Sequence, residues 1–102
     1  MSGIAFDGKK VVLSQERWLH IILRHPELKN VYELILETIS QPDEVYADPT
    51  GAFHALKRVK AVTDFLVVIY SVNGEGYIRT AYYTSNIRKT RRYKTFKKLI
   101  PF

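Results

Sequence analysis

The stretch Phe65-Leu66-Val67-Val68-Ile69-Tyr70-Ser71-Val72 decides the fold class. It is almost wholly apolar and rich in β-branched residues, which is typical of a strand that is covered on both faces. We therefore expect residues 65–72 to form the central strand of a sheet.

The residues on either side of this run also have the patterns of strands. Residues 77–84 predict a partner strand, and residues 53–59 alternate as a half-exposed strand does. Residues 44–47 are a short strand candidate. Together these segments predict one antiparallel sheet of about four strands.

The first part of the chain predicts helices. After a short extended lead-in at residues 10–13, Ser14 stands where an N-cap belongs, and a helix is expected from about Gln15 to His25. Pro26 ends this helix or starts the next, because the residue before a proline avoids the helical region. Residues 27–40 repeat apolar side chains at helical spacing. The expected fold is α+β, with two N-terminal helices packed on one sheet of about four strands and a basic C-terminal tail. Within this tail, residues 85–99 are expected to form a loop followed by a short basic helix.

Length and composition exclude several classes of protein for this chain. The chain has 102 residues and no cysteine, so it predicts a single domain over residues 1–102, without disulfides or a thiol nucleophile. No apolar run approaches the roughly 18–20 residues of a membrane span, and residues 1–7 lack the pattern of an export signal. We expect a cytoplasmic protein that does not bind a membrane.

The positive charge is concentrated at the C-terminal end. Residues 86–102 contain seven basic side chains and no acidic one, a formal charge of +7, whereas residues 1–85 carry −1, so the whole formal excess of +6 lies in this segment. Their basic residues are Arg88, Lys89, Arg91, Arg92, Lys94, Lys97 and Lys98. Interleaved with Tyr93 and Phe96, they point to a phosphate-rich partner, although a solvated basic surface would have the same pattern.

Two segments carry candidate functional side chains. Arg17, His20 and Arg24 fall on one face of the first predicted helix, whereas His25 lies at its end. On the strand at 77–84, strict alternation would place Arg79 with Tyr83 on one face and Thr80 with Tyr82 and Thr84 on the other. Arginine is rarely buried unpaired, which favours Arg79 on the open face.

Metal and nucleotide-cofactor sites are not indicated. His20 and His25 are not spaced as a helical ligand pair, and no carboxylate cluster accompanies His54. Gly74 and Gly76 do not form a phosphate-binding loop, and no serine is flanked by glycines. We expect no cofactor and no metal.

The chain resembles a known family of ribonucleases in two places. The corner Arg24-His25-Pro26-Glu27 and the strand Ile78-Arg79-Thr80-Ala81-Tyr82 are similar to the small phage-associated branch of the BECR-fold ribonucleases, the group of barnase, EndoU, colicin and RelE-like domains. The similarity spans about residues 11–90. It implies metal-independent cleavage of RNA on the open face of a curved antiparallel sheet. Many relatives are toxins, so it also allows a cognate antitoxin or immunity protein as partner.

The resemblance assigns the site residue by residue. His25 and Arg79 with Thr80 stand in the motif positions, and His20 is the next catalytic candidate. The 2′-hydroxyl of RNA is the nucleophile, so the protein must move protons with imidazole and stabilise phosphoryl charge with arginine. The residues expected to bind RNA are Tyr83, Thr84, Arg88, Lys89, Arg91, Arg92 and Lys94.

Two readings from other classes remain open. A non-catalytic module that binds RNA or DNA would use the same basic segment and aromatic strand. A structural or interaction domain would use the motif residues for packing alone, and a single histidine is more often structural than functional.

Overall fold

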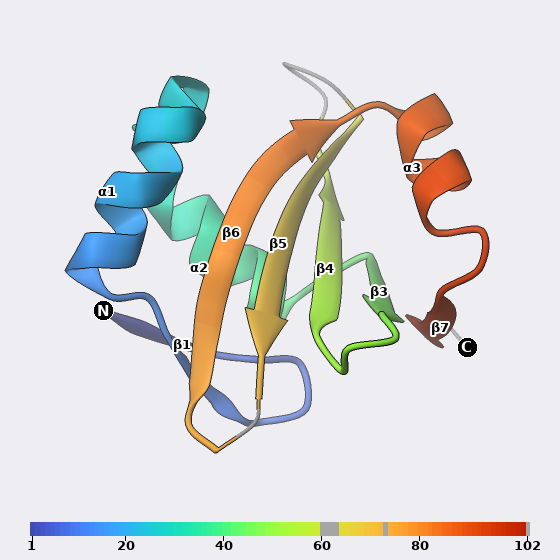
Figure 1. Cartoon of the computed structure of the whole chain (residues 1–102), viewed down its shortest axis with the longest axis horizontal. Helices are drawn as coiled ribbons and strands as arrows, with labels where there is room; N and C mark the ends of the chain where they lie inside the picture. Colours follow the sequence, from blue (N-terminus) through green and yellow to red (C-terminus); the bar gives the residue numbers. More distant parts are fainter. Residues whose placement is uncertain (60–63, 73, 102) are drawn as a thin grey trace.

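The apolar run at 65–72 lies at the centre of the sheet, as predicted. The computed structural model describes residues 1–59, 64–72 and 74–101. In it β5 (Phe65–Ser71) lies between β4 (Phe53–Arg58) and β6 (Gly76–Thr84) and is antiparallel to both. β3 (Glu44–Ala47) pairs antiparallel with β4, so all four predicted strands are present (Figure 1).

The sheet is larger than predicted and mixed. Within the described residues it has seven strands in the order β1-β2-β6-β5-β4-β3-β7. The additional strands are β1 (Ser2–Ile4), β2 (Lys10–Val12) and β7 (Lys97–Ile100). β2 runs parallel to β6, and Gly76 is required at this pairing because a Cβ there would lie 2.5 Å from the Lys10 carbonyl oxygen. The prediction of about four antiparallel strands is therefore wrong. The additional strands are too short to show a strand pattern in the sequence, and they form because they pair with other strands.

Three helices lie within the described residues. α1 (Gln15–Arg24) begins as predicted, because the Ser14 hydroxyl accepts a hydrogen bond from the Arg17 N–H. α2 (Tyr32–Ser40) is shorter than the predicted helix, because residues 26–28 form a separate 3₁₀ turn, η1 (Pro26–Leu28). α3 (Asn86–Arg92) is capped by Ser85 and leads to β7.

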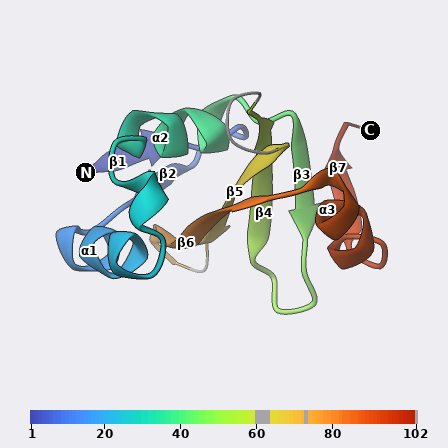
Figure 2. The same ribbon diagram turned by 90° about the horizontal axis from the view of Figure 1, so that it is seen from above.

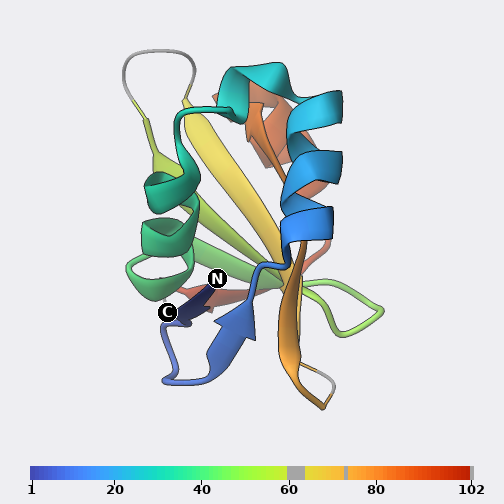
Figure 3. The same ribbon diagram turned by 90° about the vertical axis from the view of Figure 1, so that its left-hand side faces the viewer.

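The helices are distributed around the sheet. α2 covers one face, α1 lies beside β6, and α3 stands toward the opposite face near β3 and β7 (Figures 2 and 3). The predicted packing of two N-terminal helices on one sheet of about four strands is wrong. The short basic helix expected within residues 85–99 is present as α3, but it begins directly after β6 and is followed by the unexpected strand β7. The C-terminal residues are a helix and an edge strand of the same domain.

Apolar side chains fill both faces of the sheet. The core on the side of α2 includes Ile21, Ile35 and Val68, together with other residues of α1, α2 and the strands. A second core under α3 is formed by Tyr46, Ala52, Leu56, Phe65, Val67, Ile69 and Tyr93. The part of this second face that lies over β6, toward α1, carries Tyr77, Arg79, Thr80 and Tyr82, and we call it the open face. Of the helices in the described ranges, none is long and apolar enough to cross a bilayer.

Candidate functional site

A β-bulge in β6 determines which side chains of this strand lie on the open face. Ile69 pairs with Thr80 while Tyr70 pairs with Ile78, so Arg79 is an extra residue without a partner across the β5–β6 ladder. Ile78 and Ala81 both pack into the core on the side of α2. A bulge re-aims side chains in this way and is often found beside active sites.

The bulge changes the predicted composition of the open face. Strict alternation separated Arg79 from Thr80 and grouped Arg79 with Tyr83. The structure instead places Arg79 and Thr80 together, whereas Tyr83 packs against the core on the side of α2. Burial, and then the charge of Glu27, raises the pKa of the Tyr83 phenol. Tyr83, predicted to bind RNA, is therefore not part of the open face.

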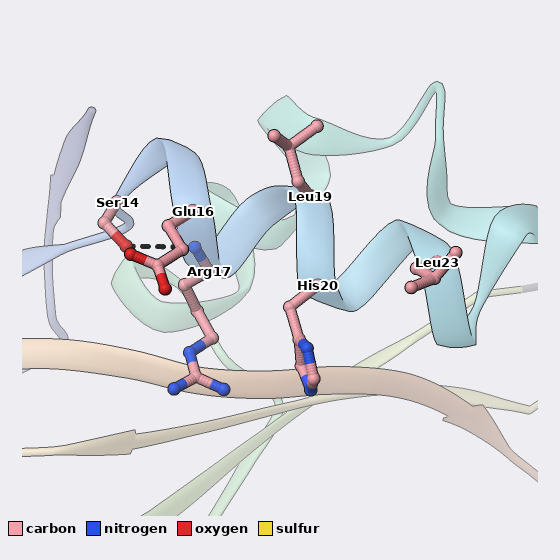
Figure 4. A pocket seen from close by; sticks show the side chains of 6 residues that line it. All are labelled: Ser14, Glu16, Arg17, Leu19, His20 and Leu23. Carbon is pink, nitrogen blue, oxygen red and sulfur yellow. Dashed lines mark hydrogen bonds between the residues drawn. The ribbon is translucent and has the colours of Figure 1, made fainter.

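A cleft of about 420 Å³ lies between α1 and β6. Its lining residues come from these two elements alone and are Arg17, His20, Arg24, Tyr77, Arg79 and Thr80. Figure 4 draws a neighbouring pocket on α1, which shares Arg17 and His20 with the cleft and is also lined by Glu16; in this view Arg17 and His20 extend toward β6, whereas Leu19 and Leu23 point elsewhere. The cleft thus brings together three of the four predicted catalytic residues, namely His20, Arg79 and Thr80.

The cleft is cationic and open to solvent. Arg17, Arg24 and Arg79 are all exposed, and no carboxylate is among the lining residues. The ion pairs found within the described residues are His54–Asp48, Lys57–Glu37 and Lys89–Glu44, so none of them involves these arginines. Three guanidinium groups without acidic partners, beside an imidazole, form a suitable site for a phosphate.

The fourth predicted catalytic residue, His25, does not line the cleft. It is the half-buried C-cap of α1, and its ring centroid lies 6.2 Å from that of Tyr82. The Arg92 guanidinium stands 5.7 Å from the same Tyr82 ring. Tyr82 therefore connects the end of α1 to α3 across the open face.

The predicted RNA-binding residues of α3 differ in their surroundings. Arg88, Arg91 and Lys94 are exposed, and so is Arg92. Lys89 instead forms a 2.7 Å ion pair with the buried Glu44 and lies over the ring of Phe65, where it stabilises the fold. Thr84, the last residue of β6, is half-buried.

A buried polar network that the sequence analysis did not identify anchors α3 to the sheet. His54, which is 1% exposed, bonds through Nε2 to Asp48 Oδ2 and through Nδ1 to the Tyr93 hydroxyl, both at 2.9 Å. Burial lowers the pKa of His54. Burial disfavours the Asp48 carboxylate, but hydrogen bonds from Thr50 and His54 outweigh that effect and hold its pKa well below the usual value. The neutral His54 ring thus donates to Asp48 and accepts from Tyr93.

The same network links the charges of the cleft and α3. Both Arg92 and Arg79 act electrostatically on His54 and lower its pKa further. They approach the open face from α3 and from β6. Positive side chains from both elements are therefore close enough to the buried His54 ring to act on it.

No group of three potential metal-ligating side chains occurs among the described residues. Comparison with models of protein families, with curated proteins and with solved structures found no match, so the function is inferred from the cleft itself.

Proposed function

We propose that this protein is a metal-independent endoribonuclease that acts in the cleft between α1 and β6. The observation that carries the proposal is the convergence of His20 with Arg79 and Thr80, from two elements far apart in the sequence. The resemblance of residues 11–90 to BECR-fold ribonucleases, often toxins, supports the same reaction.

The chemistry needs few protein groups. The 2′-hydroxyl attacks the adjacent phosphate, the bond to the 5′-oxygen breaks, and a cyclic phosphate is formed. His20 takes the proton from the attacking 2′-hydroxyl and returns a proton to the departing 5′-oxygen. Arg79 stabilises the negative charge that develops on the phosphoryl oxygens. Thr80 donates a hydrogen bond to the phosphate. Arg17 and Arg24 hold the neighbouring phosphates of the strand.

Cleavage of a defined RNA in EDTA tests the proposal. We expect cleavage to persist in EDTA, and His20→Ala to slow it by about 100-fold or more. His25→Ala is the matched comparison, because it removes the same side-chain type from the end of the same helix. A greater loss of cleavage rate in His25→Ala than in His20→Ala would show that the catalytic imidazole is that of His25, beside Tyr82. This result would contradict the assignment of catalysis to His20.

One observation favours a second function, that of a non-catalytic module that binds RNA or DNA. His20 is the only imidazole among the residues that line the cleft, whereas strand cleavage requires both removal and donation of a proton. Binding of RNA at about 50 mM salt without fragments would establish this function. Absence of binding at that salt concentration would exclude both functions and leave a structural role.

A further inference from the structure

A second pocket lies between α3 and the edge of the sheet formed by β3 and β7, away from the cleft. Its volume is about 280 Å³. It is lined by lysines and aromatic rings together with one threonine: Tyr46, Lys89, Thr90, Tyr93, Lys94, Phe96 and Lys98. We call it the lysine pocket. Its aromatic residues belong to the core under α3, so it opens on the same side of the sheet as the cleft.

The pocket has positive charge that the fold does not use. Lys89 is neutralised by Glu44, which also accepts a hydrogen bond from the Tyr46 hydroxyl. Lys94 and Lys98 are exposed, and neither belongs to an ion pair found among the described residues. The Lys94 ammonium is therefore available to bind an anion, and so is the Lys98 ammonium, which has no close ion-pair partner there but also acts electrostatically on the Glu44 carboxylate and lowers its pKa.

The aromatic part of the pocket lining is uncharged and consists of rings packed against one another. The rings of Tyr46 and Tyr93 stack with centroids 4.6 Å apart, and Phe96 meets Tyr93 edge-on at 5.1 Å. Burial raises the pKa of both phenols, so their hydroxyls carry no negative charge that would repel a phosphate. The edges of the rings offer an apolar surface for a sugar.

We infer that the lysine pocket binds the sugar–phosphate backbone of the RNA strand that occupies the cleft, several nucleotides from the phosphate that reacts. This inference rests on the proposed function. β6 and β3 are separated by β5 and β4, which puts these two strands, and the sites beside them, at least about 14 Å apart at about 4.8 Å per strand. At about 3.4 Å per stacked nucleotide, this span corresponds to about four nucleotides. Arg92, which stands over Tyr82, lies between the two sites.

The length of the RNA therefore separates the two sites experimentally. At about 3.4 Å per stacked nucleotide, an RNA of two nucleotides, with one phosphodiester bond, is too short to span the two sites and fills the cleft alone, whereas one of fourteen reaches the lysine pocket. RNA with 2′-O-methyl groups binds without being cleaved, because the nucleophile is blocked. Fluorescence anisotropy of labelled strands between 50 and 300 mM salt gives the affinity and its dependence on salt.

Lys98→Ala and Lys97→Ala form a matched pair of variants. The two residues are adjacent on β7, both are exposed, and they point to opposite faces, with Lys98 alone lining the pocket. For the long RNA, we expect Lys98→Ala to reduce the slope of log affinity against log salt by about 0.7, the value for one phosphate contact to a single strand. If electrostatic binding vanishes near 1 M salt, this slope corresponds to about eight-fold weaker binding at 50 mM. The short RNA and the Lys97→Ala variant should show less than half of this change.

Three results would overturn the inference. Equal effects of Lys97→Ala and Lys98→Ala would mean that overall charge, and not a pocket, attracts the strand. An equal effect of Lys98→Ala on both RNA lengths would place Lys98 at the cleft. If the unaltered protein binds neither RNA, then RNA is not a ligand of this pocket. Urea denaturation confirms that each variant is folded.

The inference and the proposed function fail in different ways. A protein that shows the selective effect of Lys98→Ala but does not cleave unmodified RNA in EDTA would refute the enzyme and keep the pocket. A protein that cleaves RNA and responds equally to the two substitutions would refute the pocket and keep the enzyme.

Discussion

The His54 network predicts that the protein loses stability in mild acid. In the folded protein, burial lowers the pKa of His54, whereas in the unfolded chain the ring titrates near its ordinary value of about 6.5. Below that pH the unfolded chain binds more protons than the folded one, so the free energy of unfolding falls as the pH falls. Asp48 adds nothing in this range, because its pKa is lowered and it remains ionised in both states.

The size of the effect follows from the proton linkage. Each pH unit between the two pKa values of His54 changes the free energy of unfolding by about 1.4 kcal/mol. Between pH 7.5 and 5.5, the fully buried ring should contribute a loss of up to about 1.4 kcal/mol, because only the last unit lies below the unfolded pKa.

His54→Gln removes the titrating ring and keeps a donor toward Asp48. The variant should be less stable than the parent by about 1–3 kcal/mol at pH 7.5, because the buried Tyr93 hydroxyl loses its acceptor. The difference between the two proteins should then shrink as the pH falls to 5.5. All other titrating groups are common to both proteins, so the change in this difference isolates His54.

Urea denaturation at a series of pH values, followed by the fluorescence of Trp18, measures both free energies. Trp18 is the single tryptophan of the chain and packs edge-on against Tyr32, so its emission reports on unfolding. A parent protein whose stability does not change from pH 7.5 to 5.5, or changes as much as that of His54→Gln, would refute the linkage.

Three other predictions concern the cleft, the Lys89 ion pair and metals. Arg79→Ala should slow RNA cleavage by about 100-fold or more, because one preorganised group that stabilises negative charge is lost. The free energy of unfolding should change by less than about 0.5 kcal/mol, since the side chain is exposed; a circular dichroism spectrum of an unfolded variant would show that Arg79 is structural. Lys89→Ala should destabilise the protein by about 3 kcal/mol in urea denaturation, because the buried Glu44 carboxylate loses its ion-pair partner and keeps only the hydrogen bond from Tyr46. Substitution of the exposed neighbour, Arg88→Ala, should cost less than about 0.5 kcal/mol; equal effects would contradict this. RNA cleavage should be the same before and after dialysis against EDTA, and elemental analysis should find no stoichiometric metal; activity that is lost in EDTA and restored by zinc would disprove it.

The parts of the fold that could be predicted have strong local signals. β5 has an unbroken apolar run, and α1 has a capping serine followed by an amphipathic pattern. The edge strands β1 and β7 have only three and four residues, too few to show alternation. β7 pairs with β3, which is distant in the sequence, and β1 pairs with the neighbouring β2, which in turn joins the sheet through the distant β6. Their existence is a tertiary effect that local patterns do not contain.

The site could be predicted only in part for a similar reason. The common face of Arg17, His20 and Arg24 follows from helical geometry, and the structure turns that face toward β6. The grouping of Arg79 with Thr80 depends on a bulge, which inserts a residue and breaks the period-two pattern from which the faces were predicted. The roles of Lys89 and His54 could not be predicted, because they depend on partners, such as Glu44 for Lys89 and Tyr93 for His54, that only the folded structure brings close.

The edges of the sheet have a consequence for handling the protein in solution. An exposed edge strand can recruit a strand from another molecule and start aggregation, and natural proteins limit this with short edges, lysines and proline. Both edges here are short, and β7 carries Lys97 and Lys98 and is followed by Pro101, which has no N–H to donate. Lys97→Ala and Lys98→Ala each remove one of these safeguards. Both variants should therefore be kept at low protein concentration and checked for self-association before their affinities are compared.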